Sequence, residues 1–198
     1  DEQKKAEWAT LARISGVLGV IAVFWFVYDQ SASTWVYFAQ NSMDMTVWGD
    51  WKTTPDQIQA LNPFLIIFFT PLFNIMWDAL KKARGGSDVP DTRKMLAGFI
   101  IVVVCMLTMS AAAFAASPDH KISVWWLAIA TFVITVSELC VSVVGLEFAF
   151  KQALPGTKSA VTGAFWLTVF VGDTVAGFFN DTFWNKDHPG PFFAIQAV

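Results

Sequence analysis

The sequence contains little charge and little cysteine. Charged residues make up 15% of the 198 positions, well below the quarter that is usual in soluble domains. The net charge is −3 and the basic residues stand in short clusters, so the chain lacks the basic footprint of a nucleic-acid-binding protein. Its two cysteines, Cys105 and Cys140, both lie in apolar runs. This excludes a disulfide framework and a four-ligand metal site, and we expect both to be core residues.

Apolar and aromatic residues take the place of the missing charge. They reach 55% of the chain, with 19 Phe and 10 Trp, and residues 95–117 contain no charge at all. A bilayer span needs about 20 apolar residues, and no run carries a polar stripe wide enough for a soluble amphipathic helix. We predict an all-α polytopic membrane protein whose five complete spans are followed by the start of a sixth in residues 191–198. The five spans are residues 14–39, 58–79, 95–116, 122–149 and 159–180.

The polar segments between the spans predict an orientation. Loops on one side hold ten of the 13 lysines and arginines and loops on the other side hold three, in the alternation that five crossings require. By the positive-inside rule, the side with ten is cytoplasmic. We therefore expect residues 1–13 to be a cytoplasmic amphiphilic lead-in and residues 14–198 to be a transmembrane bundle. The expected location is the plasma (inner) membrane. The chain begins without Met and ends inside an apolar segment, so we expect it to be a piece of a longer protein.

Three acidic residues lie deep inside predicted spans. Asp29, Glu138 and Asp173 are the candidates for function, because an ionisable group in hydrocarbon is costly and usually faces a partner, a cavity or a substrate path. A buried ion pair remains the structural alternative for the first two. Glu147 lies near the end of its span, where it can pair with Lys151 four residues later, and we assign it a structural role.

Helical spacing places other polar and aromatic residues beside these acids. Trp25 precedes Asp29 by one turn and Ser142 follows Glu138 by one turn, so each pair shares a helix face. Packing remains an alternative for the tryptophan, as does a hydrogen bond between helices for the serine.

Two further spans carry candidate site residues. Trp166 shares a stripe with Asp173 on the last span. In the second span, Asn62 adjoins Pro63, and this proline and Pro71 are expected to remove backbone hydrogen bonds, which is tolerated where a cavity is lined. For Asn62 too, a hydrogen bond between helices is equally compatible with the spacing.

Four segments, in this order and spacing, resemble the carboxyl-terminal half of the proton-dependent oligopeptide transporters of the major facilitator superfamily. They are FWFVYDQSASTWVYFAQ (24–40), QIQALNPFLIIFFTPLF (57–73), SELCVSVVGLEFAFKQALP (137–155) and GAFWLTVFVGDTVAG (163–177). The resemblance covers the chain from about residue 14. It implies that the five spans are helices seven to eleven of that fold and that the sixth begins helix twelve.

The resemblance also implies roles for the residues of the first three segments. Asp29 would form a proton-sensitive ion pair with an arginine of the amino-terminal half, and Trp25 would line the pocket. Asn62 and Glu138 match positions that hold the amino group of the peptide. An ammonium group bound in a site of low dielectric favours a carboxylate together with a neutral acceptor.

Two further positions match the family, and two depart from it. Ser142 matches a pocket serine, and Trp166 falls at or beside the pocket tryptophan of helix eleven. Val143 stands where the family usually has proline, which predicts a straighter helix ten. Asp173 stands where the family usually has asparagine, and so adds a titratable group.

The function that we expect is proton-coupled symport of di- and tripeptides by the intact protein. Protons are the coupling ion, with no cofactor, metal or catalytic residue, and the partners are small peptides, membrane lipid and the amino-terminal half. A carrier of another small solute is the main alternative. An intramembrane aspartyl protease built on Tyr28-Asp29 and Gly172-Asp173, or an inactive membrane fragment, is a weaker one. Phe170 replaces the glycine expected before the second motif, and three spans separate the acids.

Overall fold

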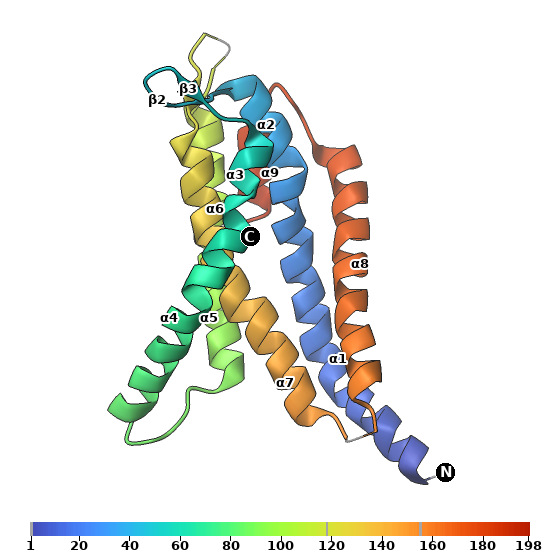
Figure 1. Cartoon of the computed structure of the whole chain (residues 1–198). Coiled ribbons are helices and arrows are strands. Elements are labelled where there is room, and N and C mark those ends of the chain that lie inside the picture. Colours follow the sequence, from blue (N-terminus) through green and yellow to red (C-terminus); the bar gives the residue numbers. More distant parts are fainter. Residues whose placement is uncertain (1, 118, 155) are drawn as a thin grey trace.

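A computed structural model of the chain describes residues 2–117, 119–154 and 156–198. Asp1, the first residue of the expected lead-in, lies outside the described residues. Figure 1 shows long helices that run lengthwise beside one another. The α-helices are α1 (Glu2–Tyr28), α2 (Thr34–Ser42), α3 (Pro55–Gln59), α4 (Leu61–Ala83), α5 (Asp91–Ala115), α6 (Trp125–Glu138), α7 (Val144–Gln152), α8 (Lys158–Phe183) and α9 (Pro189–Ile195).

The five predicted spans are confirmed. Among the described residues, five helical segments are long and apolar enough to cross a membrane: Ile14–Ser42, Pro55–Ala83, Asp91–Ala115, Trp125–Gln152 and Lys158–Phe183. The lead-in is part of the first helix, because α1 begins at Glu2 and the sequence before residue 14 has neither glycine nor proline to end a helix. The expected start of a sixth span is the short helix α9.

Two of the spans change helix type at their acidic residue. In the first span, α1 passes into a 3-10 turn, Asp29–Ala32, before α2. In the fourth, a π-helical turn, Leu139–Val143, separates α6 from α7 directly after Glu138. The fourth span is therefore bent despite Val143, and that it is straighter than a helix with proline at this position stays a prediction. A π-helical turn inserts a residue into the helix, and Figure 1 shows that α7 leaves the direction of α6.

Close backbone packing accompanies the π-helical turn. A Cβ on Gly98 of α5 would lie 2.5 Å from Val141 Cγ2 and 2.9 Å from Cys140 Cβ, so only glycine fits there. Ser137, just before the turn, donates from its hydroxyl to Gly98 O at 2.8 Å. Cys140 and Cys105 are both buried with free thiols, as predicted.

Helices α1 and α8 form a tight parallel pair. A Cβ on Gly172 would lie 2.6 Å from Trp25 Cβ, and eight residues further along α8 Asn180 donates to Ser33 Oγ at 3.4 Å. The two contacts have the same sequence offset, so the helices keep one register over two turns.

Helix α4 lies at the edge of the bundle. It has no buried residue and packs against α6, and Figure 1 shows its far end diverging from the other helices.

Short strands close one end of the bundle, which we call the hairpin end. Strand β1 (Met43–Asp44) pairs in parallel with β4 (Ile122–Ser123), and β2 (Thr46–Trp48) forms a hairpin with β3 (Trp51–Lys52). At the opposite end, which we call the amino end, Lys151 Nζ lies 2.9 Å from Glu147 Oε1 and 3.1 Å from Asp91 Oδ2. The structural role that we assigned to Glu147 agrees with this contact.

Candidate functional site

Asn62 and Glu138 meet between α4 and α6. Asn62 Nδ2 donates to Glu138 Oε2 at 2.9 Å. The chain breaks its helix at Ala60, and α4 restarts there with Asn62 in its first turn. Pro63 also lies in that first turn, where no helical N–H bond is lost, so the expected backbone break is present only at Pro71 inside α4.

A threonine that the sequence analysis did not single out completes this contact. Thr135 Oγ1 accepts a second hydrogen bond from Asn62 Nδ2, also at 2.9 Å, and itself donates to Thr131 O at 2.7 Å. Thr135 is fully buried. The stripe Thr131, Thr135 and Glu138, with intervals of four and three, places polar groups on one face of an otherwise apolar helix. This polar stripe is the feature of the sequence that could have identified Thr135.

Tyr28 is the second residue that the sequence analysis missed. It is the last residue of α1, and its side chain lies near the Glu138 carboxyl group and the Asn62 amide. A cavity of about 210 Å³ adjoins this meeting point of α1, α4 and α6. It is lined by Tyr28, Ser31, Ala32, Gln59, Asn62, Thr131 and Ile134.

Asp29 and Asp173 lie near each other across the seam between α1 and α8. Asp173, which is exposed, and Glu138 are the charged groups near Asp29. Asp29 Oδ2 is buried and accepts no hydrogen bond from the described residues. Gly172 opposes Trp25 one turn before Asp29, and Asp173 is the next residue of α8.

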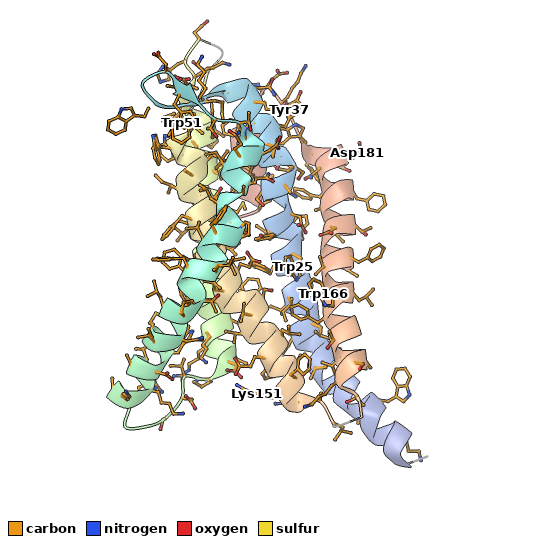
Figure 2. All side chains as sticks on the ribbon, viewed as in Figure 1. Trp25, Tyr37, Trp51, Lys151, Trp166 and Asp181 are labelled. Atoms are coloured by element: carbon orange, nitrogen blue, oxygen red, sulfur yellow. The ribbon has the colours of Figure 1, made fainter. Side chains whose placement is uncertain are left out.

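The two candidate tryptophans lie in opposite environments. Trp25 is only 8% exposed and packs edge-on against Tyr28, with ring centroids 5.2 Å apart, whereas Trp166 is 59% exposed. Figure 2 labels both. Ser142 is half-buried within the π-helical turn. The structure thus joins Asn62 to Glu138 by a hydrogen bond and brings Asp173 near Asp29, and it leaves Trp166 on an open face of α8.

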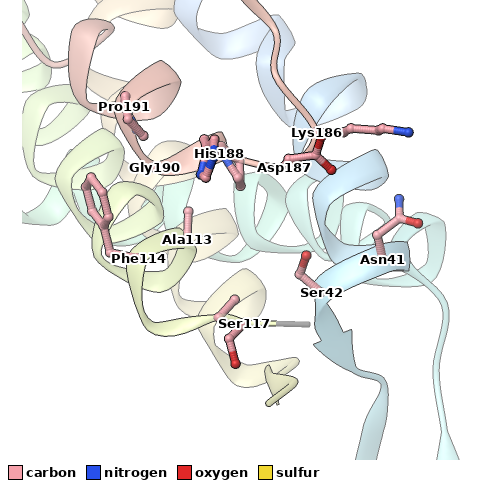
Figure 3. A pocket seen from close by; sticks show the side chains of 12 residues that line it. Asn41, Ser42, Ala113, Phe114, Ser117, Lys186, Asp187, His188, Gly190 and Pro191 are labelled. Carbon is pink, nitrogen blue, oxygen red and sulfur yellow. The ribbon is translucent and has the colours of Figure 1, made fainter. Parts of the chain in front are cut away.

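A second cavity, of about 370 Å³, lies at the hairpin end between α2, the end of α5 and the segment before α9 (Figure 3). Ser42, Phe114 and His188 are among its lining residues, and no acid of the predicted site contributes to it. Among the described residues, no three His, Cys, Asp or Glu side chains are grouped as metal ligands.

Comparison with known proteins identifies the family. The family model described as PTR2, POT family, matches residues 1–191. The chain belongs to the POT family. It is a multi-pass membrane protein, and its relatives are transporters, so the alternative of an aspartyl protease is excluded. The resemblance inferred from the four segments is confirmed.

Individual relatives agree with this assignment. The chain is 26% identical over 155 residues to dipeptide and tripeptide permease A of Proteus mirabilis, covering 78% of this chain and 30% of the permease. It is 39% identical over 95 residues to peptide transporter family 2 of Caenorhabditis elegans, covering 48% of this chain and 12% of that protein. The chain therefore spans about a third or less of these POT relatives.

Solved POT structures share the fold. The crystal structure of the POT family transporter PepTSo is 27% identical with a TM-score of 0.75, and the likeness covers 97% of this chain and 40% of that one. A crystal structure of a peptide transporter POT has a TM-score of 0.82 at 19% identity, covering 97% and 37%. The chain therefore has the fold of one part of a major facilitator transporter.

Proposed function

We propose that the intact protein is a proton-coupled symporter of di- and tripeptides, and that this chain contributes the part of the site that holds the peptide amino group. The contact of Asn62 with Glu138 carries the proposal. It places a carboxylate and an amide between two spans, beside a cavity. Relatives whose names describe dipeptide and tripeptide permeases support peptides as the substrate class.

The chemistry of this contact suits an ammonium ion. In a site of low dielectric, a primary ammonium group needs acceptors for three N–H donors and a compensating negative charge. Glu138 supplies the charge, and the carbonyl oxygen of Asn62 supplies a neutral acceptor. The hydroxyl group of Tyr28, whose side chain lies near both, adds a third oxygen. Ser142 and Trp166 would line the more distant part of the pocket, as the family resemblance implies.

The proposed coupling ion is the proton, without a cofactor. Asp29 and Asp173 lie near each other on neighbouring helical segments. Two carboxyl groups this close repel each other when both are ionised, so they favour a bound proton between them or a cation beside them. An arginine from the amino-terminal half would be such a cation. Exchange of the proton for that cation would link protonation to the movement of the two halves.

The proposed partner is the amino-terminal half of the same transporter, and the proposed location is the inner membrane with the amino end cytoplasmic. Large apolar side chains remain exposed along α4 and α8, among them Phe64, Phe68, Phe170 and Phe178. In a bilayer such faces contact either lipid or another helix. At the hairpin end, Trp48 is 83% exposed, consistent with an aromatic belt at the outer surface.

Uptake of a labelled dipeptide by the full-length protein in liposomes tests the proposal. We expect saturable uptake that requires an inward proton gradient and is lost in Glu138→Gln, because glutamine keeps the shape but not the charge. Glu147→Gln is the matched control, since Glu147 pairs with Lys151 at the amino end. Its uptake should match wild type. If no di- or tripeptide is transported or competes, the protein carries another solute and the ammonium-binding roles of Asn62 and Glu138 are wrong.

A further inference from the structure

We infer that Thr135 is a positioning residue, which holds the Asn62 side chain with its carbonyl oxygen toward the substrate. This inference rests on the proposed function, because it concerns how the same site recognises an ammonium group. Asn62 Nδ2 donates to Thr135 Oγ1 and to Glu138 Oε2, each at 2.9 Å. These two acceptors stand one turn apart on α6 and together bind both hydrogens of the amide.

While its own hydrogen is bonded to Thr131 O, Thr135 acts as an acceptor toward Asn62. A hydroxyl group has one hydrogen, and that of Thr135 goes to Thr131 O at 2.7 Å. The oxygen of Thr135 therefore offers lone pairs to the neighbouring amide. If Asn62 were flipped, its carbonyl oxygen would face that oxygen with no hydrogen between them, which is costly at a buried site. The hydroxyl group of Thr135 thus selects one of the two orientations of the amide.

Glu138 does not select the orientation in the same way. An ionised carboxylate accepts hydrogen bonds only, but a protonated carboxyl group can also donate. Whenever Glu138 carries a proton, the carboxyl group could donate to a flipped Asn62 carbonyl. The Thr135 hydroxyl could donate to a flipped Asn62 carbonyl only by giving up its hydrogen bond to Thr131 O, and this cost does not depend on the protonation of Glu138. It therefore maintains the orientation of Asn62 whether or not Glu138 is protonated.

The orientation of the Asn62 amide decides which of its atoms remains to bind a ligand. With both hydrogens of Nδ2 engaged, the group that Asn62 has left to offer is Oδ1, and a carbonyl oxygen has two lone pairs. Asn62 lines the cavity of about 210 Å³, and in the inferred orientation Oδ1 is the atom that it presents to a ligand there. The ligand that it fits is a hydrogen-bond donor such as a primary ammonium group. A peptide with an acetylated amino terminus lacks that charge and two of its donors.

Three variants of the full-length transporter test the inference. Thr135→Val keeps the shape of the side chain and removes the hydroxyl group, and Thr135→Ser restores it. Thr108→Val is the matched control, because Thr108 also donates to its own helix, to Val104 O at 2.8 Å, and has no asparagine partner in the described residues. The measurement is competition of labelled dipeptide uptake by a free dipeptide and by its N-acetylated form.

We expect Thr135→Val to lower the apparent affinity for the free dipeptide by about tenfold, as for loss of one oriented hydrogen bond. The apparent affinity for the acetylated dipeptide should fall much less. Thr135→Ser should recover wild-type selectivity, and Thr108→Val should not alter it. Equal weakening of both peptides, no change, or a serine variant that behaves like valine would each overturn the inference, because a purely structural threonine does not discriminate between the two peptides.

A second measurement separates this inference from the proposed function. The protein is labelled with 15N at asparagine, and Asn62→Ala assigns the signal of Asn62. Both protons of the Asn62 side-chain amide should be protected from exchange with solvent. In Thr135→Val, one of them should exchange faster. If the wild type transports no peptide but this change occurs, the positioning role stands and the peptide proposal fails. If the change does not occur, the positioning role is wrong whatever the substrate.

Discussion

Asn62 and Glu138, which are 76 positions apart in the sequence, are joined by a hydrogen bond of 2.9 Å between the second and fourth spans. This bond makes the two residues one unit, so their substitutions should not act independently. We expect Asn62→Ala and Glu138→Gln each to weaken peptide binding, and the double variant to bind little worse than Glu138→Gln alone. Equilibrium binding of a labelled dipeptide to the purified variants measures the cycle. Additive losses would show that the two side chains bind different parts of the substrate.

Trp25 and Trp166 should respond differently to removal. Trp25 is 8% exposed, so Trp25→Ala should cost about 3–5 kcal/mol of folding stability through the cavity that it leaves. Trp166 is 59% exposed, so Trp166→Ala should leave the thermal unfolding temperature nearly unchanged and raise the KM for peptides. Thermal unfolding and uptake, measured on the same two variants, check both. A stability loss at Trp166 without a KM change would assign it to packing.

The seam between α1 and α8 should tolerate no side chain at Gly172. A Cβ there would lie 2.8 Å from both Ala22 O and Phe26 N, which are backbone atoms that cannot move aside separately. We expect Gly172→Ala to destabilise the protein by about 1–3 kcal/mol through overpacking. Gly177→Ala on the same helix meets nothing within 4 Å and should be neutral or stabilising. Thermal unfolding in detergent compares them, and equal effects would contradict the tight seam.

Asp29 should be needed for coupling rather than for binding. We expect Asp29→Asn to abolish peptide accumulation driven by a proton gradient while exchange of peptide for peptide continues, because exchange requires no net proton movement. Asp173→Asn should reduce accumulation less, since it leaves Asp29 in place. Asp181→Asn, an exposed acid on the same helix, is the control. Retained accumulation in Asp29→Asn would remove Asp29 from the coupling mechanism.

The turn at Asp44 should weaken in acid. The hydroxyl group and the amide of Thr46 both donate to Asp44 Oδ1, at 2.8 and 3.1 Å, and hold the pKa of Asp44 below its usual range. Because the pKa is lowered in the folded state, the stabilisation is fully present at pH values above the ordinary aspartate pKa of about 4. It is lost as the pH falls through the pKa of the folded protein.

The matching measurement is thermal unfolding of wild type and Asp44→Asn across pH. We expect the difference in unfolding temperature to be largest near neutral pH and to shrink below about pH 4. Asp50→Asn, in the adjoining β2–β3 hairpin, is the control because Asp50 makes no hydrogen bond with Thr46 among those described. A difference that does not depend on pH would mean that the Asp44 carboxylate is not the stabilising group.

Much of the candidate site could be found by sequence reasoning because acids in apolar runs are conspicuous. Asp29, Glu138 and Asp173 were selected on that ground, and Asn62 by its place next to a proline. Thr135 and Tyr28 were missed. Threonine and tyrosine are common in spans, and their polar groups become informative only when a partner from another helix is known to face them.

The tryptophans show a second limit. Trp25 and Trp166 each share a helix face with an acid, so spacing gave them the same role. Their exposures differ because Trp25 packs toward Gly172 on α8, whereas Trp166 lies on an open side of that helix. Which face of a span another helix covers depends on how the helices pack. Helical periodicity within one span does not contain that information.

The sequence by itself determined the five described segments that are long and apolar enough to cross a membrane, and which acids they carry, because the bilayer acts on each segment separately through its length and apolarity. The tertiary structure alone decided the partners of those acids: Asn62 and Thr135 beside Glu138, and Asp173 beside Asp29. It also decided the π-helical turn after Glu138, where α5 approaches at Gly98. These features depend on contacts between helices far apart in the chain, and such contacts form only when the helices pack.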